Sequence, residues 1–114
     1  MSDRRTGELF ILQDTEVKGA ITWMEKGTAA IMMFTRGEFA EEYITRIYPT
    51  RPIVVYKVRK QQMKDFVHNM LNSGIEYAIV DVPWQHADIS ESYEDEVVRD
   101  YAIVDLRLVV ARFM

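Results

Sequence analysis

The densest mix of chemically active side chains lies at residues 84–88, where an indole, an imidazole and a carboxylate occur together. His86 and Asp88 are two residues apart, so both side chains point to the same side if this stretch is extended. Such a pair can act as acid and base, or supply two ligands to a metal ion. The only other histidine, His68, falls off the apolar stripe of a predicted helix and is expected at the surface. We therefore predict no metal site, and an enzyme that uses His86 and Asp88 is the lesser functional interpretation.

Three loops that follow predicted strands, one of them residues 84–88, carry basic or other polar side chains that could bind a ligand. Two of these loops open predicted helices, whose first N–H groups lack intrahelical partners and attract anions. If the three strands are parallel, their carboxyl ends share one edge of the sheet, where ligands tend to bind. The residues of this predicted anion-binding site are Thr35, Arg36, Gly37, Arg59, Lys60, Trp84, His86 and Asp88.

The sequence excludes several kinds of chemistry. It contains no cysteine, so disulfides, thiolate nucleophiles and cysteine zinc sites are ruled out. Gly37 stands alone, which matches neither a dinucleotide-binding nor a P-loop pattern, and no cofactor is predicted. No serine lies in a nucleophile-elbow context, so no catalytic residue is predicted and the interpretation leans away from an enzyme. A short chain without cysteine favours the cytoplasm.

Charge is unevenly distributed along the chain. The net charge is −4, so attraction to nucleic acid or an anionic membrane is not expected. Residues 46–64 contain six basic side chains and no acidic one, whereas residues 81–105 contain eight acidic side chains and one basic one. Two solvated faces are the simplest interpretation; an anion-binding face, or two complementary faces that associate, are the functional ones. Nucleic-acid binding would require residues 46–64 to form one basic stripe with Tyr48 and Tyr56.

The N-terminal third is predicted to be a β-meander. Residues 9–12, 17–24 and 28–34 are rich in apolar and β-branched side chains and are bounded by turn residues. Gly27 can adopt the positive φ that a short hairpin loop between the second and third strands requires.

The middle of the chain alternates between helical and strand patterns. Apolar residues up to Ile47 recur at helical spacing, with Thr35 as the expected N-cap and Glu38 completing a capping box. Residues 53–58 predict a buried strand, and residues 77–82 another. Between them lies a helix that should end near Gly74. Its expected apolar stripe consists of Met63, Phe66, Val67, Met70 and Leu71.

The C-terminal segment alternates apolar and polar residues from Ala102 to Val110, which predicts a long final strand. A terminal helix is the weaker alternative, because the segment is rich in β-branched residues. We expect one globular domain over residues 1–114, of α/β (or α+β) class: a β-meander followed by β-α-β-α-β and the long strand, with about six strands and two main helices.

These patterns favour an accessory interaction module that associates with itself, most simply as a homodimer. The long apolar strand reaching Phe113 and Met114 and the split of charge support this expectation. A domain that binds a small anionic ligand at the strand ends is the alternative. No segment approaches the ~20 apolar residues that a membrane helix needs.

Overall fold

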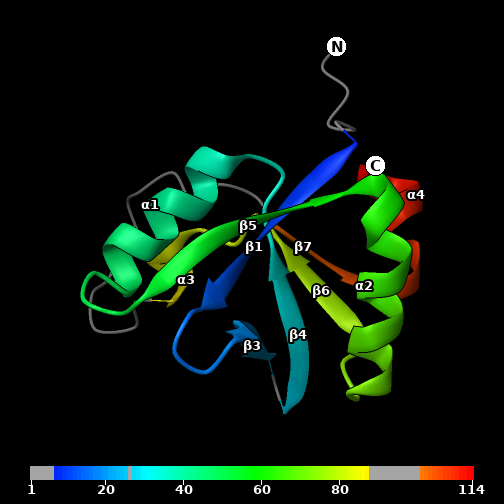
Figure 1. The fold of residues 1–114 in the computed structure, drawn as a ribbon, viewed down its shortest axis with the longest axis horizontal. Helices are drawn as coiled ribbons and strands as arrows, with labels where there is room; N and C mark the ends of the chain where they lie inside the picture. The colour runs from blue at the N-terminus through cyan, green and yellow to red at the C-terminus, as the bar shows by residue number, and fades with distance from the viewer. Residues whose placement is uncertain (1–6, 26, 88–100) are drawn as a thin grey trace.

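Two antiparallel strands, β1 (Glu8–Asp14) and β4 (Thr28–Met33), lie at the centre of the protein. The computed structural model describes residues 7–25, 27–87 and 101–114. The two strands meet where the backbone groups of Phe10 and Phe34 exchange hydrogen bonds of 2.9 and 2.8 Å. Both strands have buried side chains on both faces, because helices cover each side of the sheet (Figure 1).

The predicted second strand is broken in two, β2 (Gly19–Ala20) and β3 (Thr22–Glu25). β2 pairs with β1, whereas β3 pairs with β4. Ile21 joins the two parts: its amide donates to the Leu12 carbonyl over 2.8 Å, and its carbonyl accepts from the Met32 amide over 3.4 Å. The chain therefore passes from one central strand to the other.

Two helices connect the next three strands. Helix α1 (Gly37–Ile47) links β4 to β5 (Ile53–Arg59), and α2 (Lys60–Asn72) links β5 to β6 (Tyr77–Val80). β6 pairs with β4 in parallel, as the alternation of strands and helices predicted. β5 instead pairs with β1 in antiparallel fashion, so it points the same way as β4 but lies at the edge of its sheet. The prediction that β5 is buried is wrong, since four of its seven side chains are exposed.

The chain returns to the sheet as β7 (Ala102–Asp105), which pairs antiparallel with β6. The predicted long final strand is wrong beyond this point, because a 3-10 turn, η1 (Leu106–Leu108), and helix α4 (Val109–Phe113) follow. Asp105 pairs with Tyr77, the first residue of β6, and one more backbone hydrogen bond follows, from the Leu106 amide to the Glu76 carbonyl over 2.8 Å, before the chain turns away. The Asp105 carboxylate accepts the Arg107 amide over 2.9 Å, which starts the turn.

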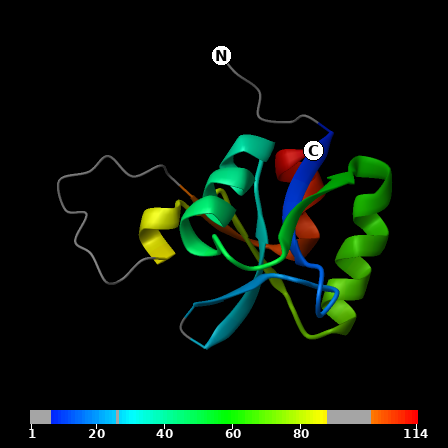
Figure 2. The same cartoon turned by 60° about the vertical axis from the view of Figure 1, so that its left-hand side comes forward.

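The strands form two hydrogen-bonded groups, in the orders β2-β1-β5 and β3-β4-β6-β7. Helix α1 lies on one side of the strands and α2 on the other, as Figure 2 shows from a second direction. The mixed class and the two main helices are confirmed. The described residues contain seven strands instead of about six, because the second predicted segment is broken in two, and the last predicted segment is a strand only over Ala102–Asp105.

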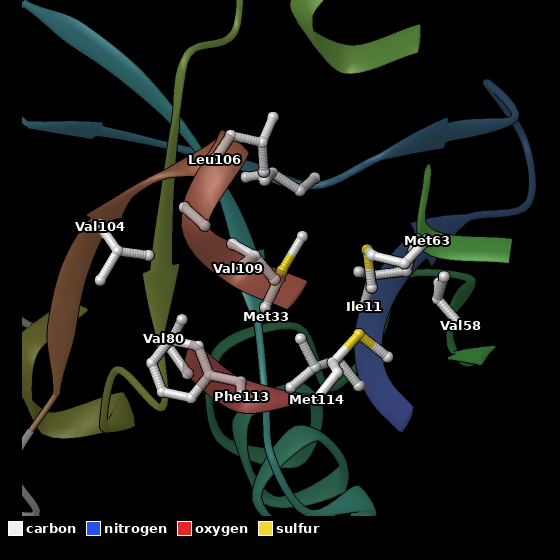
Figure 3. Close-up of a cluster of buried hydrophobic side chains, with 13 residues drawn as sticks. Ile11, Met33, Val58, Met63, Val80, Val104, Leu106, Val109, Phe113 and Met114 are labelled. Atoms are coloured by element: carbon white, nitrogen blue, oxygen red, sulfur yellow. The ribbon is translucent and has the colours of Figure 1, made fainter. Parts of the chain in front are cut away.

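Each side of the sheet has its own core. On one side, Met33 of β4 packs with residues of α2 and α4, among them Met63 and Val109 (Figure 3). The predicted stripe of α2 is confirmed, because Met63 is fully buried and its other four residues pack partly buried against this core. On the other side, the ring of Phe34, which directly follows β4, packs against that of Tyr43 on α1, with the ring centroids 5.8 Å apart.

Candidate functional site

The carboxyl ends of the parallel strands β4 and β6 meet at Thr35 and Asp81. The Thr35 amide donates to Oδ1 of Asp81 over 2.8 Å, and the Thr35 hydroxyl donates to Oδ2 over 2.6 Å. A hydroxyl beside a carboxylate resembles an activated nucleophile. Both residues are buried, however, with exposed fractions of 8% and 4%, so a substrate has little access to them. The pair fastens the two strand ends together.

Thr35 does not cap α1, so that prediction is wrong. Arg36 is the N-cap, and its carbonyl accepts from the Phe39 amide over 3.2 Å. The Thr35 hydroxyl is instead used by Asp81, and a hydrogen bond to a carboxylate is stronger than one between neutral groups.

Asp81 is the residue at this edge that sequence reasoning missed, because it was placed inside a strand at 77–82. It has a φ of +62°, which Asp tolerates better than most residues, and its amide donates to the Met33 carbonyl over 2.9 Å. A signal was present in the sequence: an acidic residue directly follows the apolar run of β6, two residues before Pro83.

Arg36 and Gly37 lie beside this pair at the start of α1. Nε of Arg36 is 2.5 Å from a carboxylate oxygen of Glu38, and its guanidinium carbon is 5.4 Å from the centroid of Phe39. A Cβ atom added at Gly37 would lie 3.5 Å from the Phe10 ring of β1. The charge of Arg36 is thus balanced by Glu38, and the Asp81 carboxylate lies at the same edge. Two carboxylates therefore oppose an anion at this position.

Arg59 and Lys60 lie at the end of β5, and β1 separates them from Thr35. Two strand spacings amount to about 10 Å. The amides at the start of α2 also have partners: that of Arg59 donates to Oε1 of Gln62 over 3.0 Å, and that of Lys60 to the Gly7 carbonyl over 2.8 Å. The ends of β4, β5 and β6 point the same way, but Arg59 and Lys60 are not in contact with Thr35.

The third predicted loop begins with Trp84, which opens the short helix α3 (Trp84–Ala87). The half-buried Trp84 ring packs towards α1, with the guanidinium carbon of Arg46 4.8 Å from its centroid. His86 belongs to α3, and Asp88 lies outside the described residues. Their acid–base role stays a prediction. Within the described ranges, no group of three side chains is placed to hold a metal ion.

A second candidate site is the outer edge of β5, formed by Val54, Val55, Tyr56 and Lys57 and called the β5 edge below. β5 ends its sheet, and no strand in the described part of the chain lies beyond it. Val54 and Tyr56 are on the same face of β5 and are 46% and 47% exposed. Large apolar side chains on an open strand edge are typical of a surface that associates.

The backbone of the β5 edge follows from the register of its ladder with β1. At the two ends of the ladder the Thr15 amide donates to the Pro52 carbonyl and the Lys60 amide donates to the Gly7 carbonyl. The even-numbered residues of β5 therefore direct their N–H and C=O groups towards β1. The odd-numbered residues direct their N–H and C=O groups outward. The amide of Ile53 donates to the Arg51 carbonyl, and that of Arg59 to Gln62.

The remaining two outward amides of β5 are those of Val55 and Lys57. Neither has a hydrogen-bond partner among residues 7–25, 27–87 and 101–114. Lys57 uses its side chain elsewhere, since its Nζ is 3.6 Å from a carboxylate oxygen of Glu8 on β1. The β5 edge therefore offers two donors and two acceptors of the backbone to an added strand.

The start of β5 is fixed by a buried carboxylate, Asp14, at the end of β1. Its oxygens accept from the amides of Glu16 and Val17 over 2.9 and 3.2 Å and from the Arg51 guanidinium over 2.6 Å. The hydrogen bond from the Val17 amide is the main cause that lowers the pKa of Asp14, with Glu16 and Arg51 adding to it and burial opposing it. This cluster holds the turn before β5 against β1.

The comparisons with known proteins identify no relative: the sequence matches no protein-family model, and no curated protein is significantly similar to it. Within the described residues, no helix has the length and apolar character required to span a membrane.

Proposed function

We propose that this protein is an accessory interaction module that forms a homodimer by pairing its β5 edge with that of a second copy. The observation that carries the proposal is the pair of outward amides, Val55 and Lys57, beside the exposed side chains of Val54 and Tyr56. An open strand edge is a template for pairing with another chain, and added strands are a common mode of recognition.

The β5 edge replaces the surface that the sequence suggested for association. The C-terminal segment is not an exposed strand, since Leu106 and Val109 are fully buried and Phe113 nearly so. On β5, by contrast, the polar backbone and the apolar side chains are both available. Absence of cysteine favours the cytoplasm as the site of this function.

Binding of a small anion at the strand ends has less support. Glu38 and Asp81 place negative charge beside Arg36 and Thr35, and Arg59 lies across β1 from them. We therefore put the association of β5 first.

The test removes one outward amide. Lys57→Pro deletes the N–H that points away from β1, and proline is tolerated on an edge strand at such a position. Lys57→Ala is the matched control, because it removes the same side chain but keeps the amide. Sedimentation equilibrium at about 50 μM should give twice the 13.4 kDa chain mass for the wild type and Lys57→Ala, and the chain mass for Lys57→Pro.

The thermal midpoint of each variant shows whether it is folded. A change of about 1 kcal/mol corresponds to about 4–8 °C in a domain of this size, so Lys57→Pro should stay within that range of Lys57→Ala when both are compared as monomers. A monomeric wild type at 50 μM, or a Lys57→Pro variant that stays dimeric, would overturn the proposal.

A further inference from the structure

We infer that the two copies of β5 pair antiparallel about Tyr56, so that Tyr56 lies opposite Tyr56 of the second copy. This inference rests on the proposed function and adds the register of the interface. A twofold axis perpendicular to the sheet makes the two strands antiparallel and makes each register symmetric about one residue or one pair. Three independent features of β5 select the register centred on Tyr56.

The first feature is the position of the two outward amides. In the register centred on Tyr56, Val55 of one copy pairs with Lys57 of the other, and each donates to the carbonyl of its partner. All four unpartnered amides of the dimer are thereby used. The outward amides that already have partners, those of Ile53 and Arg59, fall at the ends of the interface.

The second feature is the distribution of charge. Centring on Tyr56 places Lys57 opposite Val55 and Arg59 opposite Ile53, so no two cations face one another. A register centred on Val55 would place Arg51 opposite Arg59, and one centred on Lys57 would place two lysines together. Like charges directly opposite in a sheet are destabilising.

The third feature is the extent of overlap and of apolar contact. Tyr56 is the middle residue of β5, so all seven residues of the strand find partners in this register. The exposed rings of the two tyrosines meet on the axis, and the exposed Val54 lies opposite Val58 of the second copy. Aromatic pairs across strands are among the more stabilising contacts in sheets.

Disulfide trapping tests the register without interference, because the chain contains no cysteine. Tyr56 of the two copies would form a non-hydrogen-bonded pair with Cα atoms about 4.5 Å apart, within the range that a disulfide spans. Oxidised Tyr56→Cys should therefore run as a covalent dimer that reductant reverses. Val54→Cys is the matched control: the residue is equally exposed on the same face, but its two copies would be about 13 Å apart.

A mixture provides a second measurement that keeps Tyr56 intact. Val55→Cys and Lys57→Cys should form a covalent heterodimer when mixed, and neither should link to itself. Self-linking of Val54→Cys, Val55→Cys or Lys57→Cys, with a dimeric wild type, would overturn the register and leave the proposed function standing. A monomeric wild type in sedimentation would overturn both.

Discussion

β4 and β5 are both apolar strands next to α1, yet one lies at the centre of the molecule and the other at its edge. β4 has strands on both sides, and its last four residues are buried. β5 has a neighbouring strand, β1, on one side only. Ile53 and Val58 are its two buried residues, and the three residues between Val54 and Val58 are half-buried or exposed. The sequences differ in one telling respect, because β5 carries Lys57 and Arg59 and β4 carries no charge. Charged side chains, above all lysine, are typical of edge strands. The inner strand β1 carries charge only at its two ends, Glu8 and Asp14, whereas Lys57 lies inside β5.

The two strands are also held in different ways. The end of β4 is fastened by a buried hydrogen-bonded pair, Thr35 with Asp81, and by the packing of Phe34. The start of β5 is fastened by Asp14 and Arg51, whose side chain is 53% exposed. Both positions therefore use a buried carboxylate, but its partner is buried at the end of β4 and half exposed at the start of β5.

The largest difference should appear when an aromatic ring is removed from each region. Phe34→Ala deletes a fully buried ring and should lower the free energy of unfolding by about 3–5 kcal/mol. Tyr56→Ala deletes a half-exposed ring and should lower it by less than about 1 kcal/mol. Urea unfolding at a concentration where both variants are monomeric measures this, and equal losses would remove the distinction between centre and edge.

An intermediate effect is expected at the end of β4. Thr35→Val keeps the shape of the side chain but leaves the buried Asp81 carboxylate without its hydroxyl donor, which should cost about 1–3 kcal/mol. Thr45→Val is the control, because that exposed hydroxyl only bonds to the Glu41 carbonyl of its own helix and should matter by about 0.5 kcal/mol or less. If the two substitutions had the same effect on unfolding in urea, Thr35 would not fasten the strand end.

The last effect, that of Asp14→Asn, should depend on pH. The pKa of Asp14 is lowered below its usual 3.8 in the folded protein, so its ionised form stabilises the fold above that value. This stabilisation is lost as the pH falls through the lowered pKa. Asp14→Asn should thus be less stable than wild type at pH 7 and should approach it near pH 2.

Asp65→Asn, an exposed change of the same charge on α2, controls for net charge. Urea midpoints for the three proteins across this pH range provide the measurement. A difference between Asp14→Asn and wild type that persisted unchanged at pH 2 would show that the charge of Asp14 does not stabilise β5.

Local patterns in the sequence predicted the parts of the fold that local physics controls. The stripe of α2 follows from helical spacing, the end of α2 from Gly74 at φ +87°, and the hairpin from Gly27 at φ +83°. Pairing between strands that are far apart in the sequence could not be predicted from such local patterns. Antiparallel pairing of β5 with β1 depends on contacts some 45 residues apart in the chain, which no periodicity records.

The candidate sites also depend on contacts between residues far apart in the sequence, which local patterns do not predict. The sequence placed Thr35 at the end of a strand, but the competing partner for its hydroxyl, Asp81, is 46 residues away. The prediction of a long final strand was wrong because the period of two continues beyond Asp105, which pairs with the first residue of β6. Whether an apolar strand such as β5 lies at an edge likewise depends on the order of strands. Lys57 and Arg59 were a signal of an edge, but this signal was not used and a buried strand was predicted.

The positive φ of Asp81 limits which amino acids this position can accept. Glycine would adopt a φ of +62° freely but would leave the Thr35 amide and hydroxyl without acceptors. Glutamate and the β-branched residues would be strained by the backbone. Only aspartate and asparagine combine a tolerated left-handed conformation with a short side chain that reaches Thr35. A library randomised at residue 81 and selected for folded protein should retain those two and little else.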